Sequence, residues 1–215
     1  NITTESWTGV NCDEAINRYS LKNLVTTIDL NNRQLTGSIP AELGYLTGLV
    51  ELDLSENSLT GSIHSDWMCD SLHYLTMLRL DSNTLSSSIP DCIGNLTRLT
   101  DLRLANNQFS SSVPYSLSNL TLLTELDLSN NQLTGSFPLS IFYLPALQSL
   151  MAQNNQLTIL PDMGNGNPAE TENGLGGYNI KYLTYIDFSN NQITSNILGD
   201  GTWGLWMPQL ITLYL

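Results

Sequence analysis

A phrase of about sixteen residues recurs along the chain, and it limits the possible folds more than any other feature. The best-preserved copies stand at residues 123–138 (LTELDLSNNQLTGSFP), 49–63 (LVELDLSENSLTGSI) and 99–114 (LTDLRLANNQFSSSVP). Weaker copies begin at Val25, Leu75, Leu147, Leu183 and Leu210. Repetition of this kind is typical of a solenoid, in which each unit buries its apolar side only against its neighbours.

Asparagine recurs three residues after the second apolar residue of each L-x-L triplet. This column consists of Asn57, Asn83, Asn107, Asn131, Asn155 and Asn191, at spacings of 26, 24, 24, 24 and 36 residues. The L-x-x-L-x-L alternation before each asparagine predicts a short strand with one buried face. A buried amide without partners costs about 1–3 kcal/mol. A whole column of amides therefore predicts a continuous ladder of hydrogen bonds, in which Arg33 takes the asparagine's place in the first repeat.

The segment after the strand carries a second motif. L-T-G-S-I-P stands at residues 35–40 and, with Phe137 for isoleucine, at residues 133–138, while LTGSI stands at residues 59–63. In this motif the chain resembles plant-type leucine-rich-repeat proteins over residues 25–215. The resemblance implies an α/β solenoid of the horseshoe type, with a parallel concave β-sheet and short 3-10, helical or irregular convex segments. It points to the extracellular domains of receptor-like proteins and kinases, and to polygalacturonase-inhibiting proteins.

The resemblance also divides the chain into an N-terminal cap, residues 1–24, and a solenoid of about seven or eight repeats, residues 25–215. Residues 7–12, WTGVNC, resemble the W-x-G-V-x-C cap of the family, but Glu5 stands where a second cysteine is usual. We therefore expect Cys12 to lack its usual partner. The last repeat ends without a closing cap, so we expect the chain to be truncated there, or another chain to pack on this C-terminal edge.

Residues 162–179 form a long insertion rich in glycine and asparagine. Such a composition predicts a surface loop. Two interpretations stay open at this point: a neutral variation in length, and an island that folds over or beside the binding face.

The chain carries 7 basic and 20 acidic residues among 215, a formal net charge of −13. This balance argues against a nucleic-acid partner and against docking on anionic lipid, because both need a basic surface. No apolar run is long enough for a membrane span. The 3 cysteines and 2 histidines, His64 and His73, are not spaced as a metal site. No catalytic constellation and no cofactor motif is recognisable, so we expect a protein that is not an enzyme.

Two further features concern the flanks of the solenoid. Cys69 and Cys92 lie 23 residues apart at the same phase of neighbouring repeats, which predicts a disulfide, with two buried thiols as the alternative. N-glycosylation sequons begin at Asn1, Asn95 and Asn119, the last two 24 residues apart in one column. The G-N-L-T consensus of the repeat can also generate sequons without any use for them. Occupied sites would close this flank and direct a partner to the concave sheet.

The concave face can be located because alternate strand residues point to the same side. Its candidate ligand-binding residues are Glu51, Asp53, Met77, Arg79, Asp101, Arg103, Glu125, Asp127, Met151, Tyr185, Asp187 and Tyr214. Ion pairs of Arg79 with Asp53 or Asp101 could be purely structural. The other interpretation is a recognition surface anchored by Arg79, Arg103, Tyr185 and Tyr214, whose residue types are favoured in binding hot spots.

These observations favour an extracellular recognition module, secreted or on the cell surface, that binds a protein or peptide. A cell-wall or surface glycan is a second candidate ligand. One alternative is a structural component of an extracellular assembly. A weaker alternative is ice binding, for which Thr26, Thr76, Thr100, Thr124 and Thr184 form an interrupted column at strand spacing.

Overall fold

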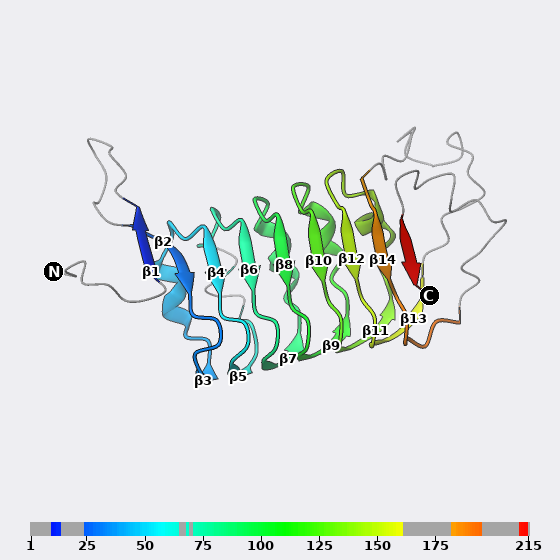
Figure 1. Ribbon diagram of the computed structural model, residues 1–215, viewed down its shortest axis with the longest axis horizontal. Coiled ribbons are helices and arrows are strands. Elements are labelled where there is room, and N and C mark those ends of the chain that lie inside the picture. The colour runs from blue at the N-terminus through cyan, green and yellow to red at the C-terminus, as the bar shows by residue number, and fades with distance from the viewer. Residues whose placement is uncertain are drawn as a thin grey trace.

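The protein is a solenoid whose coils each contribute one strand to a nine-stranded sheet. A computed structural model describes residues 10–13, 24–64, 68, 71–160, 182–194 and 211–214. Within these residues the strands follow one another along the long axis of the molecule in chain order (Figure 1). The predicted solenoid with a parallel sheet is confirmed. The insertion at 162–179 lies outside the described residues.

The nine-stranded sheet has the order β1-β2-β4-β6-β8-β10-β12-β14-β15. Its strands are β1 Val10–Asp13, β2 Leu24–Asp29, β4 Glu51–Asp53, β6 Met77–Arg79, β8 Asp101–Arg103, β10 Glu125–Asp127, β12 Ser149–Met151, β14 Tyr185–Asp187 and β15 Thr212–Tyr214. Neighbouring strands are parallel except β1, which pairs antiparallel with β2. β1 belongs to the predicted cap, and it occupies the β2 edge that the first coil would otherwise expose.

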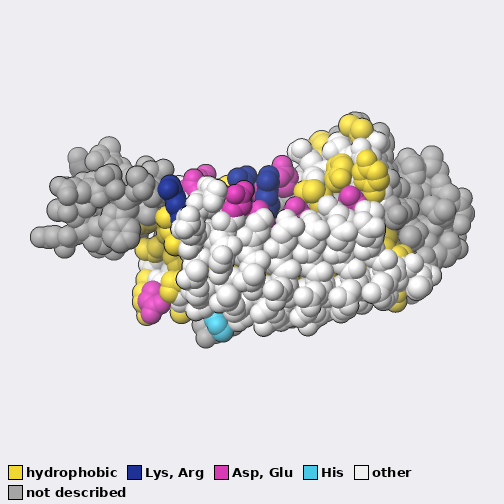
Figure 2. Space-filling view, turned by 60° about the horizontal axis from the view of Figure 1, so that its bottom comes forward, with side chains coloured by type: hydrophobic (Ala, Val, Ile, Leu, Met, Phe, Trp, Pro, Cys, Tyr) yellow, Lys and Arg dark blue, Asp and Glu magenta, His cyan; other side chains and the backbone are white. Residues whose placement is uncertain are grey.

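A second parallel sheet lies along the flank and was not predicted. Its order is β13-β11-β9-β7-β5-β3. Its strands are β3 Thr36–Ser38, β5 Ser58–Gly61, β7 Thr84–Ser88, β9 Gln108–Ser112, β11 Gln132–Ser136 and β13 Gln156–Ile159. The L-T-G-S and L-S-S-S segments form these strands, with one leucine or phenylalanine turned into the core. Apart from the exposed Ile159, their other side chains are those of serine, threonine and glutamine, and they form the flank without charged side chains in Figure 2.

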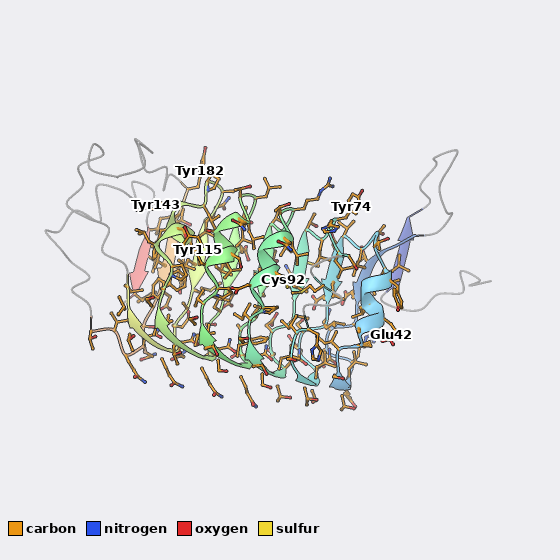
Figure 3. The ribbon with its side chains drawn as sticks, turned by 180° about the vertical axis from the view of Figure 1, so that it is seen from behind. Glu42, Tyr74, Cys92, Tyr115, Tyr143 and Tyr182 are labelled. Atoms are coloured by element: carbon orange, nitrogen blue, oxygen red, sulfur yellow. The ribbon has the colours of Figure 1, made fainter. Side chains whose placement is uncertain are left out.

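Short 3-10 helices close the convex side, as the resemblance implied (Figure 3). They are η1 Ala41–Tyr45, η2 Asp91–Asn95, η3 Tyr115–Asn119 and η4 Leu139–Tyr143. A proline precedes each of them, at positions 40, 90, 114 and 138, with φ between −73° and −66°. The pyrrolidine ring fixes φ near this value and has no N–H to leave unpaired, so proline suits the start of each turn.

The core is one continuous layer of leucines and phenylalanines between the sheets and the 3-10 helices. The middle residue of successive sheet strands is fully buried, as at Leu78, Leu102 and Leu126. Towards the C-terminal coils, the rings of Phe137, Phe142 and Phe188 pack together, with centroid separations of 4.9–6.0 Å. Each coil supplies only one slice of this core, so the apolar surface is buried only when coils stack.

The predicted asparagine ladder is confirmed. In a typical coil, Nδ2 of Asn107 donates to the carbonyl oxygens of Leu80, Leu104 and Ala105 at 2.9–3.3 Å, and Oδ1 accepts from Leu85 N–H at 2.9 Å. Asn57, Asn83, Asn131, Asn155 and Asn191 repeat this pattern. In the first coil, Arg33 is exposed and its backbone N–H donates to Asn57. The ladder thus joins each coil to the one before it.

The serine runs of the second sheet contain a strained position. Ser87 and Ser111 have φ of 74° and 69°, and the equivalent residues Gly37, Gly61 and Gly135 have φ of 76° to 86°. A side chain in this region costs energy that glycine avoids. We expect Ser87→Gly and Ser111→Gly each to raise the free energy of unfolding by about 0.5–1 kcal/mol, measured by urea denaturation.

Ser88→Gly is the matched control for Ser87→Gly. It lies in the same strand and is also exposed, but its φ is not positive. Glycine there gains only freedom in the unfolded chain, so this variant should be destabilised by about 0.5–1 kcal/mol. If both variants shift the urea midpoint in the same direction, backbone strain at Ser87 is not the cause.

Candidate functional site

The first sheet places the predicted face residues in two adjacent columns. Glu51, Met77, Asp101, Glu125 and Tyr185 follow one another across β4 to β14, with Ser149 between the last two. Asp53, Arg79, Arg103, Asp127, Met151, Asp187 and Tyr214 form the second column by the same register. The residue between the two columns points into the core, so the outward positions are fixed by the stacking. We call this outward side of the nine-stranded sheet the concave face.

The two arginines of the concave face are held by acids on neighbouring strands. Arg79 Nη2 lies 2.6 Å from Asp101 Oδ2, and its Nη1 lies 3.9 Å from Asp53 Oδ2. Arg103 Nε lies 3.1 Å from Asp101 Oδ1, and its Nη2 lies 2.6 Å from Glu125 Oε2. Asp101 therefore bridges both guanidinium groups. Figure 2 shows the basic and acidic side chains next to one another on this side of the molecule.

This network favours the structural interpretation for Arg79 and Arg103. Partial burial acts to lower the pKa of Arg103, but the charges of Asp101 and Glu125 outweigh it and raise that pKa. The Arg103 guanidinium therefore stays bound to its acidic neighbours, and Arg79 is held by Asp101 at 2.6 Å. An incoming anionic ligand would have to compete with carboxylates already in contact, so these arginines are weaker anchors than their residue type suggests.

A turn after the strand fixes three of the face carboxylates in position. The sequence motif of this turn was not among the features used to predict the face. In each turn, Oδ1 of an aspartate accepts the backbone N–H of a serine two residues later. The pairs are Asp53 with Ser55 at 2.9 Å, Asp127 with Ser129 at 3.0 Å and Asp187 with Ser189 at 2.9 Å. The pattern D-x-S, whose aspartate is the middle residue of the L-x-L triplet, would have indicated these turns. Their effect is to hold each carboxylate in one position.

Aromatic side chains lie at the β14 and β15 end of the face. The rings of Tyr185 and Tyr214 pack edge to face, with centroids 6.2 Å apart. The Tyr185 hydroxyl lies 3.4 Å from Asp187 Oδ2. Desolvation raises the pKa of Tyr185, and the negative charge of Asp187 raises it further. The Tyr185 phenol is therefore neutral at physiological pH and can act as a hydrogen-bond donor.

Asp81 is an acidic neighbour of the face that the sequence analysis did not include. It stands where Ser55 and Ser129 stand in other coils. Burial is the largest cause of its raised pKa, and the charges of Asp53 and Asp127 raise it further. The Asp81 carboxyl group therefore keeps its proton to a higher pH than an exposed aspartate does, mainly because it is buried.

Comparison with known proteins identifies the family of the chain. Family models described as leucine rich repeat match residues 97–157, and also 48–69, 74–96 and 182–202. The chain is 30% identical to the ectodomain of the receptor kinase SOBIR1 from Arabidopsis thaliana, over 72% of this chain and 84% of that one, with a TM-score of 0.66. The chain belongs to the leucine-rich-repeat family.

Other relatives of this leucine-rich-repeat protein are plant receptors too. The Arabidopsis receptor kinase HAESA ectodomain, solved with a peptide hormone ligand, matches 98% of this chain and 32% of its own, with 27% identity and a TM-score of 0.74. Receptor like protein 24 of Arabidopsis thaliana is 40% identical over 98 residues, 45% of this chain and 11% of that protein. The leucine-rich-repeat chain thus aligns with about a tenth of the length of that relative.

The predicted threonine column of this leucine-rich-repeat protein is engaged with the main chain. Hydroxyls of Thr76, Thr100, Thr124 and Thr184 donate to carbonyl oxygens of the preceding coil at 2.8–3.2 Å. Their hydrogens are therefore engaged, while each hydroxyl oxygen keeps acceptor lone pairs. The ice-binding alternative stays a prediction.

Of the predicted disulfide and glycosylation residues, Cys92 and Asn95 lie in η2 and Asn119 lies in η3. Cys92, at the start of η2, is disulfide-bonded, whereas Cys69 lies outside the described residues, so the pairing of the two stays a prediction. Asn95 and Asn119 end η2 and η3 and are exposed, as a glycan acceptor must be. Their glycosylation also stays a prediction, and Asn1 lies outside the described residues.

Neither a metal site nor a membrane-spanning helix is found among the described residues. They contain no group of three or more histidine, cysteine, aspartate or glutamate side chains that could hold a metal ion. His64 and His73 are exposed on the surface, away from the concave columns. No helix among the described residues has the length and apolar character needed to cross a bilayer.

Proposed function

We propose that this chain is an extracellular recognition module that binds a protein or peptide partner through its concave face. The HAESA ectodomain, part of which matches 98% of this chain, was solved with a peptide hormone ligand. A secreted or cell-surface location fits such relatives and the exposed sequons at Asn95 and Asn119. The proposal assigns the ligand-binding role to the two columns of outward side chains.

The observation that carries the proposal is the combination of binding-type side chains with a rigid support. Met77, Met151 and Tyr185 are partly exposed on strands that are hydrogen-bonded to a neighbour on each side, and Tyr214 is exposed on β15, the last strand of the described sheet. Tyrosine is enriched in binding hot spots because it offers a large, amphipathic surface at a low entropy cost. Side chains that are already fixed lose little freedom on binding, which favours affinity.

Exposed tyrosines on both sides of the molecule allow a matched test. A library of secreted peptides and receptor ectodomains is screened for binding, and any partner is measured against two double variants. Tyr185→Ala/Tyr214→Ala removes the concave pair, and Tyr45→Ala/Tyr115→Ala removes two tyrosines of η1 and η3 on the convex side (Figure 3). We expect the concave variant to weaken binding at least tenfold, about 1.4 kcal/mol or more, and the convex variant to leave it nearly unchanged. The reverse result would reject the concave face as the binding surface.

A further inference from the structure

The concave face from β10 to β15 has a different charge balance from the part before it. Further towards the N-terminus, both arginines of the face are held by Asp53, Asp101 and Glu125. On the described residues of β10 to β15, Asp127 and Asp187 project from the face, and these strands contain no lysine or arginine. Arg103 is the register neighbour of Asp127, but its ion pairs are with Asp101 and Glu125, so among the described residues neither Asp127 nor Asp187 has an ion pair.

The two carboxylates are fixed in position but keep capacity to accept hydrogen bonds. Oδ1 of Asp127 is held by Ser129 N–H at 3.0 Å, and Oδ1 of Asp187 by the N–H and hydroxyl of Ser189 at 2.9 and 2.6 Å. Oδ2 of Asp187 lies 3.4 Å from the Tyr185 hydroxyl, which is long for an O–H···O hydrogen bond. A carboxylate offers about four acceptor positions, so both groups keep unused ones. Asp127 is the more accessible of the two, because it is partly exposed whereas Asp187 is 8% exposed.

Met151 stands between the two carboxylates. The register of β10, β12 and β14 aligns Asp127, Met151 and Asp187, so the aspartate Cα atoms lie about 10 Å apart, two strand spacings. This separation leaves room for one partner side chain above the methionine.

The aromatic pair completes this end of the face. Tyr214 is 51% exposed and packs edge to face on Tyr185, one strand beyond Asp187. The faces of tyrosine rings attract cations that lie within about 6 Å. The rings, the methionine and the two carboxylates therefore favour the same kind of group, a positively charged one on an apolar stem.

We infer that Asp127, Met151, Asp187, Tyr185 and Tyr214 form a docking sector for an arginine or lysine side chain of a peptide partner. This inference rests on the proposed function and adds the chemical class of the ligand. The carboxylates supply charge-assisted hydrogen bonds, Met151 contacts the aliphatic stem, and the tyrosine rings contact the cationic group.

The test uses a synthetic Gly-Ser peptide of about eight residues with two arginines at alternate positions, which places both side chains on one side of an extended chain. In its control peptide, neutral citrulline replaces each arginine. We expect the arginine peptide to bind the wild-type chain at least tenfold more tightly than the citrulline peptide at about 0.15 M salt. Asp127→Asn/Asp187→Asn should remove this preference, since asparagine keeps the Oδ1 acceptor of each turn but not the charge.

Glu42→Gln/Glu56→Gln is the matched control variant, because it also removes two negative charges, at exposed positions outside the concave columns. It should change the affinity for the arginine peptide by less than about twofold, since exposed charges at a distance are screened. Equal binding of the two peptides, or equal loss in both double variants, would overturn the inference. A screened partner that depends on Tyr185 and Tyr214 but not on Asp127 and Asp187 would overturn it as well, while leaving the proposed function standing.

Discussion

Asn107→Ala is expected to lower the free energy of unfolding by about 3–4 kcal/mol. The Asn107 side chain is 8% exposed and satisfies three carbonyl groups and one N–H of two coils. Alanine leaves the buried Leu85 N–H without its acceptor and removes one donor from each of the three carbonyl groups, which keep their hydrogen bonds from Asn83, Asn131 and the Ser82 N–H. Urea denaturation followed by far-ultraviolet circular dichroism measures the change.

The neighbouring residue provides the control for Asn107→Ala. Gln108 is exposed at the start of β9, so Gln108→Ala should change the free energy of unfolding by no more than about 0.5 kcal/mol. Asn57→Ala should have an intermediate effect, because Asn57 is only partly buried and bonds to the exposed first coil. Equal midpoints for the Asn107 and Gln108 variants would show that the ladder contributes little to stability.

Phe137→Ala is expected to lower the free energy of unfolding by about 3–5 kcal/mol, because it empties a buried ring site. Phe137 is 2% exposed and packs edge to face on Phe142 and Phe188, with centroids 5.7 and 4.9 Å away. Ala152, the register neighbour of Phe188, is small, so the rings fill space that leucines fill in other coils. Phe137→Ile, which restores the residue of the L-T-G-S-I-P motif, should be milder because it leaves a smaller cavity.

A differently placed aromatic residue provides the control for Phe137→Ala. Tyr115 is 70% exposed at the start of η3, so Tyr115→Ala should leave the urea midpoint nearly unchanged. If Phe137→Ala and Tyr115→Ala have similar midpoints, the aromatic cluster does not stabilise the C-terminal coils as described.

The sequence alone predicted the coil and its ladder because both repeat. The spacing of Asn83, Asn107 and Asn131 is constant, and the structure places each one to bond the turn before it. The second sheet was not predicted for a physical reason. In β7, Ser86, Ser87 and Ser88 show no apolar alternation, and the positive φ of Ser87 interrupts the regular strand geometry that such patterns assume.

The candidate site was predictable in its columns but only partly in its contacts. Alternation was sufficient to place Arg79 beside Asp53 and Asp101, and both contacts are present. The pairing of Arg103 with Glu125 was not predictable, because several acids lie within reach and rotamers decide among them. The two arginines are therefore engaged with acids within the face. The carboxylates without an ion pair among the described residues, Asp127 and Asp187, lie towards the end of the face that carries Tyr185 and Tyr214.

The most direct test of the concave face as the recognition surface is hydroxyl-radical footprinting with a bound partner. Methionine and tyrosine react with oxidants where they are accessible. The chain carries tyrosines on both sides, and Met151 lies on the concave face. The account predicts that a partner protects Met151, Tyr185 and Tyr214 from oxidation, while Tyr45 and Tyr115 stay as reactive as in the free chain. Protection of Tyr45 and Tyr115 without protection of Met151, Tyr185 and Tyr214 would contradict it.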